Sequence, residues 1–66
     1  METAFTNELG NQITIRVTEG APIGVAKQLV VTMIGPDSVM ENTITEMEAE
    51  MLVRALVDYQ NTKRTL

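Results

Sequence analysis

The stretch ITEMEAEMLVRAL, residues 44–56, decides the fold, because a helix begins inside it. Thr45 and Glu48 have the spacing of a capping box, in which each side chain accepts a hydrogen bond from the other residue's backbone amide. Glutamates crowd the first turns and two basic residues stand near the far end, an arrangement that complements the helix dipole. The pattern predicts a helix near residues 46–61.

This helix has an apolar arc wider than contact with one sheet requires. At 100° per residue, a central stripe should pack on the sheet, with an apolar flank on each side. The stripe consists of Ala49, Leu52, Ala55, Leu56 and Tyr59, one flank of Met47 and Met51, and the other of Val53 and Val57. The remaining charged strip is narrow, and in it Glu50 and Arg54 have the favourable i,i+4 spacing.

Three segments before the helix have strand patterns. Residues 12–18, QITIRVT, alternate strictly between apolar and polar positions, which predicts a half-buried strand. Residues 27–34 are apolar and β-branched on both faces, so a strand here should be covered on both sides. The turn sequence GPDS at residues 35–38 then predicts an antiparallel hairpin to a strand near residues 39–44.

The connections leave two points open. Residues 19–26 contain two glycines and a proline and predict a loop, which we expect to fold over the core because Ile23 and Val25 are apolar. Residues 1–11 predict either a flexible lead-in or an edge strand. We therefore expect one α+β domain over residues 1–66, with a small antiparallel hairpin or three-stranded sheet followed by one C-terminal helix.

The size of the chain predicts self-association. A chain of 66 residues buries a small fraction of its surface, and small domains commonly add disulfides, a metal or a partner chain. With Cys 0 and His 0, disulfides and thiolate or imidazole metal sites are excluded. We predict a homodimer or higher oligomer. The interface candidates are the apolar residues left over by one sheet–helix contact: Val30, Ile34, Met47, Met51, Val53 and Val57.

Charge and hydropathy limit the partners. The formal net charge of −4 disfavours attraction to nucleic-acid phosphates or anionic membranes. The N-terminus is acidic and lacks the apolar core of a signal peptide, and no apolar run is long enough to span a bilayer. We expect a cytoplasmic protein without metal or cofactor.

Composition also argues against catalysis. Without histidine or cysteine the chain cannot build a hydrolytic triad, and its paired glutamates stand where a helix start favours acidic residues. The leading hypothesis is a small non-enzymatic interaction protein that acts as a homo-oligomer, a phage or mobile-element inhibitor or accessory factor that blocks a host macromolecule. A structural subunit of a larger assembly, such as a virion, is one alternative.

Another alternative is a protein that binds or sequesters a small anionic ligand, such as a nucleotide, between its copies. Gly20, Gly24 and Lys27 could meet an anionic group together with Arg16 or Arg54. Their spacing departs from that of a Walker phosphate loop, which needs four residues between the glycines and a lysine directly after the second. A glycine-containing connection between strands accounts for the same residues.

Overall fold

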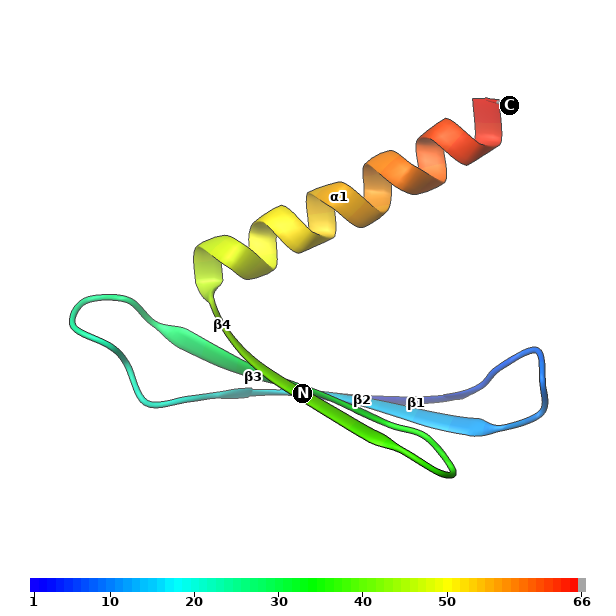
Figure 1. The fold of residues 1–66 in the computed structure, drawn as a ribbon, viewed down its shortest axis with the longest axis horizontal. Coiled ribbons are helices and arrows are strands. Elements are labelled where there is room, and N and C mark those ends of the chain that lie inside the picture. Colours follow the sequence, from blue (N-terminus) through cyan, green and yellow to red (C-terminus); the bar gives the residue numbers. More distant parts are fainter. Residues whose placement is uncertain (66) are drawn as a thin grey trace.

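The computed structural model describes residues 1–65 and arranges them as a four-stranded antiparallel sheet followed by one helix (Figure 1). The strands lie in the sheet in the order in which they occur along the chain. They are β1 (Glu2–Thr6), β2 (Gln12–Glu19), β3 (Gln28–Ile34) and β4 (Val39–Thr45), and helix α1 is Glu46–Thr65. The predicted α+β class is confirmed, but the sheet has four strands where two or three were expected, and α1 continues beyond residue 61.

The additional strand is β1, which settles the alternatives for the N-terminal segment. Strand β1 pairs with β2, and the Met1 amino group donates a hydrogen bond of 2.9 Å to the carbonyl of Val17. Glu2 forms an ion pair of 2.8 Å with Arg16 across the same two strands. The chain reverses at Gly10, whose φ of 80° is a conformation that glycine adopts without strain. Cross-strand pairing, which the short segment does not reveal by itself, makes this an edge strand.

The two faces of the sheet differ in composition. Directly opposed residues of an antiparallel pair share a face, so the register assigns every strand residue to one side. The side that α1 faces, the apolar face, carries Phe5, Ile13, Ile15, Val17, Leu29, Val31, Met33, Met40 and Ile44. The opposite polar face carries mainly threonine and charged residues. Strand β3 adds Val30 and Ile34 to it on either side of Thr32, the one buried residue among those described.

The loop between β2 and β3 does not fold over the core as expected. Ile23 and Ala26 exchange two backbone hydrogen bonds of 3.0 and 2.9 Å, and Gly24 between them has a φ of 60°. These bonds close a tight turn that carries the hairpin beyond the end of the sheet (Figure 1). Ile23 and Val25 are consequently 67% and 106% exposed. The local turn, which directs these side chains outward, overrides their apolar character.

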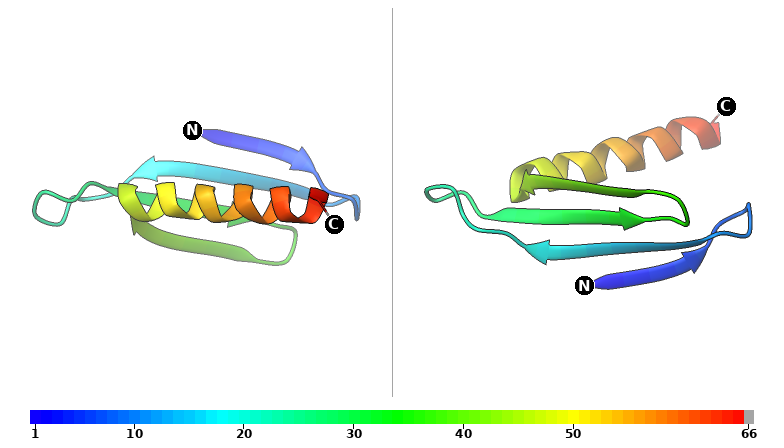
Figure 2. Two further views of the ribbon diagram at one scale, coloured as in Figure 1. Left: turned by 90° about the horizontal axis from the view of Figure 1, so that it is seen from above. Right: turned by 60° about the horizontal axis from the view of Figure 1, so that its bottom comes forward.

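Helix α1 starts directly after β4 through the predicted capping box. The Thr45 amide donates to Glu48 Oε1 at 2.8 Å, and the Glu48 amide donates to Thr45 Oγ1 at 3.2 Å. From this point the helix runs above β3 and β4 but moves steadily away from the sheet (Figures 1 and 2). Leu52 borders the sheet, whereas Leu56 and Tyr59, expected to pack on it, are 57% and 66% exposed. Across the described residues, no hydrophobic side chain is buried.

The cap gives a direct test of how the helix start contributes to stability. We expect Thr45→Ala to lower the free energy of unfolding by about 1 kcal/mol, because the Glu48 amide loses its acceptor, Thr45 Oγ1. Urea denaturation followed by circular dichroism at a fixed protein concentration measures the change. A variant as stable as the wild type would contradict the observed cap.

The same cap predicts a pH dependence. Hydrogen bonding from the Thr45 backbone amide, and then from its side chain, holds the pKa of Glu48 below its usual value. A carboxylate with a lowered pKa stabilises the fold above its unfolded pKa, about 4.3, and this stabilisation is lost as the pH falls through the folded pKa. Glu48→Gln should therefore be less stable than wild type at pH 7 and approach it in acid. Glu41→Gln, on the polar face, is the matched control.

Candidate functional site

The apolar face is one surface that is open to a partner. Phe5 and Met33 are 44% and 43% exposed, and Met40 at the β4 edge is 61% exposed. Between Leu52 of the helix and β3–β4 lies a hollow of about 190 Å³. Side chains of this kind form the interior of an ordinary small domain. In this chain they form an open surface, since α1 lies away from most of the sheet.

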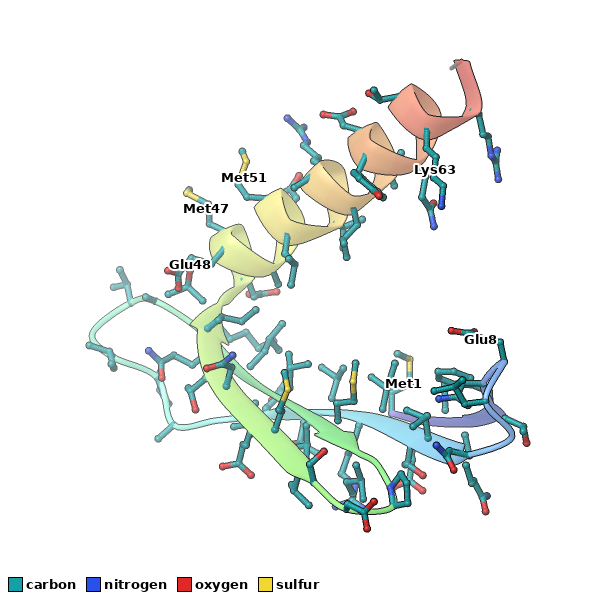
Figure 3. The ribbon with its side chains drawn as sticks, turned by 45° about the vertical axis from the view of Figure 1, so that its right-hand side comes forward. Met1, Glu8, Met47, Glu48, Met51 and Lys63 are labelled. Atoms are coloured by element: carbon teal, nitrogen blue, oxygen red, sulfur yellow. The ribbon has the colours of Figure 1, made fainter. Side chains whose placement is uncertain are left out.

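A second apolar surface lies at the turn of the β2–β3 hairpin, beyond the end of the sheet. We define the tip patch as Ile23 and Val25, the two exposed apolar residues of the hydrogen-bonded β2–β3 turn. A hollow of about 320 Å³ joins the loop to the helix start, and Ala26, Lys27, Thr45, Glu46 and Met47 line it. Met47 and Met51 point from α1 away from the sheet, above this loop (Figure 3). The hairpin turn and the helix start thus place separate apolar residues of the sequence at one end of the molecule.

Polar contacts fix the base of the tip patch. Lys27 Nζ lies 3.0 Å from Glu19 Oε1, and the carbonyl of Lys27 accepts a hydrogen bond of 3.2 Å from the amide of Glu46. The hydrogen bond from Lys27 to Glu19, then the charges of Glu19 and Glu46, raises the pKa of Lys27. The lysine is already paired with the Glu19 carboxylate. The loop is tied to the helix start by these contacts.

The five candidates for anion binding do not share one surface of the single chain. Arg16 lies on the polar face and pairs with Glu2, whereas Arg54 lies on the helix, 3.9 Å from Glu50. Gly20, Gly24 and Lys27 lie in the β2–β3 connection. A Cβ at Gly20 would approach Val30 Cγ2 to 3.3 Å, so this glycine also has a packing role. The predicted alternative, an anion-binding site formed between copies of the chain, stays a prediction.

The interface candidates divide between two surfaces. Met47, Met51, Val53 and Val57 are all exposed on α1, whereas Val30 and Ile34 are partly buried on the polar face. The sequence analysis did not include the exposed residues of the apolar face, such as Phe5, Met33 and Met40. Two features of the sequence indicate that this face stays exposed. The alternation in residues 12–18 gives a strand with one apolar face, and a single predicted helix cannot cover a wide apolar sheet.

Several site classes find no support within residues 1–65. Acidic side chains in this part of the chain do not gather into a group able to hold a metal ion. The described helix also lacks the length and apolar character needed to cross a membrane. Comparisons with protein-family models, curated proteins and solved structures give no match.

The exposure of the tip patch predicts a contrast between two valines. Val25→Ser should change the free energy of unfolding by no more than about 0.5 kcal/mol, because this side chain touches little in the folded chain. Val31→Ser, on the apolar face beneath α1, should be clearly destabilising because a hydroxyl replaces packed methyl groups. Denaturation of both variants at the same concentration measures the contrast. Equal destabilisation would show that the tip is buried in the folded assembly.

Proposed function

We propose that this protein is a small non-enzymatic interaction protein that acts as a homo-oligomer and binds another macromolecule. One observation carries the proposal: 44% of the residues are hydrophobic, yet none of the described hydrophobic side chains is buried within the single chain. Apolar burial is the main favourable contribution to folding. A chain that leaves this surface open obtains the missing burial from another chain.

The dimensions of the chain support self-association. Its radius of gyration is 14.3 Å, whereas a compact protein of this length has about 10.8 Å. The excess comes from the splayed helix and the projecting hairpin (Figure 1). Both are extended elements with apolar residues, which is the form that intertwined small oligomers require. Many obligate oligomers have no stable folded monomer, so folding and assembly are one process.

The tip patch is the surface we assign to the other macromolecule. Ile23 and Val25 stand on a hydrogen-bonded turn, so they are held in place before binding and lose little conformational freedom on contact. A projecting apolar group of this kind suits a pocket on a folded protein. We propose that the partner is a host protein that is blocked by this contact, as inhibitors and accessory factors of phages and mobile elements act.

Self-association is tested by sedimentation and by thermal denaturation over a wide concentration range. We expect an oligomer at micromolar concentration and a midpoint of unfolding that rises with protein concentration, because assembly stabilises the folded state by mass action. A folded monomer with a concentration-independent midpoint would overturn the proposal.

Partner binding is tested separately by affinity capture with matched variants. A stoichiometric host protein should be retained by the wild type and lost with the double substitution Ile23→Ser and Val25→Ser. Val39→Ser is the control, because Val39 is 65% exposed on the sheet, away from the tip patch. Loss of the partner with the control but not with the tip variant would move the binding surface to the sheet.

A further inference from the structure

The accessible surface shows how much contact the single chain lacks. It amounts to 5592 Å², whereas a folded monomer of 7.3 kDa exposes about 4200 Å² by the usual scaling. The excess is about 1400 Å², which lies within the roughly 1000–2500 Å² that each partner buries in an obligate homodimer. One further copy can therefore cover the surplus without any additional partner.

The location of the surplus follows from the widths of the elements. Four strands at about 4.8 Å spacing make a sheet roughly 19 Å wide, whereas a helix with its side chains is about 10 Å across. Seen from above in Figure 2, α1 lies over β3, with β4 along one side of it and β2 and then β1 along the other. Even if α1 were lowered onto its own sheet, the β1–β2 half of the apolar face would stay open. That half carries Phe5, Ile13, Ile15 and Val17.

Helix α1 is itself suited to lie beside a second helix. Leu52 on α1 borders the sheet, and Val53 and Val57, on one flank of the helix, are 59% and 47% exposed. A helix that packs on a sheet alone needs one apolar stripe, whereas a helix with a helical neighbour also needs an apolar flank. The charged strip with the Glu50–Arg54 pair lies away from the sheet and stays in solvent in such a layer.

We propose that α1 of a second copy lies on the β1–β2 half of the apolar face, next to α1 of the first copy. The same contact made in both directions gives a closed two-fold dimer, in which each sheet is covered by both helices. This inference rests on the self-association in the proposed function and specifies its geometry. The occupant is a second copy because the chain supplies one helix per sheet and the sheet needs two.

Inter-chain cross-linking tests this arrangement, and the absence of native cysteine makes single-cysteine variants unambiguous. Thr3 and Ala4 are neighbours on β1 that lie on the apolar and polar faces respectively. Isotopically labelled Thr3→Cys is mixed with unlabelled Leu56→Cys, refolded together and oxidised. We expect a labelled–unlabelled disulfide dimer as the main product, because the proposed placement sets α1 of one copy against the apolar side of β1 in the other. A disulfide forms only where the two Cα atoms lie within about 7 Å. Ala4→Cys with Leu56→Cys should leave this product at background.

The controls separate failure of this geometry from failure of self-association. Sedimentation of each variant before oxidation establishes that it is folded and oligomeric, and Tyr59→Cys replaces Leu56→Cys if the latter does not fold. An oligomer in which Ala4→Cys cross-links as well as Thr3→Cys would overturn the helix placement alone. So would an oligomer in which the disulfide forms only within one chain of the Thr3→Cys, Leu56→Cys double variant. A monomer would overturn both proposals.

Discussion

The mismatch between one helix and a four-stranded apolar sheet face is the constraint on which the rest of this structure depends. The face needs a cover about twice as wide as a helix, and α1 reaches only β3 and β4. Together with the departure of α1 from the sheet, this shortage accounts for the absence of a buried apolar residue among those described, the large accessible surface and the exposed stripe of α1. The fold is complete in its backbone connections but incomplete in its core.

The polar interactions of the fold are complete within one chain, whereas its apolar interactions are not. The strand ladders, the hairpin turns and the helix cap find their hydrogen-bond partners within one chain, and no buried side-chain donor or acceptor of the described residues lacks a partner. Backbone groups must be satisfied wherever water is excluded, and the sheet meets this condition within one chain. What the partner supplies is apolar contact.

The two apolar surfaces differ in shape and therefore suit different roles. The apolar face is broad and continuous, which suits a permanent contact with a second copy. The tip patch is small, projects from the sheet and is held by the Ile23–Ala26 bonds, which suits insertion into a pocket. The carbonyl of Lys27 accepts a hydrogen bond from the Glu46 amide and so links the base of this hairpin to the start of α1.

The sequence by itself determined the features that depend on residues a few positions apart. The Thr45–Glu48 cap, the turn at residues 35–38 and the alternation in residues 12–18 are local, and the structure contains all three. Only the tertiary structure decided that residues 2–6 form an edge strand, that Ile23 and Val25 point outward, and that Leu56 and Tyr59 stand away from the sheet. These outcomes depend on pairing between distant residues, such as Phe5 with Ile13 and Gly20 with Gln28, and on the angle at which α1 leaves β4. Hydrophobicity states which side chains favour burial, but the geometry of the assembled elements decides whether one chain can bury them.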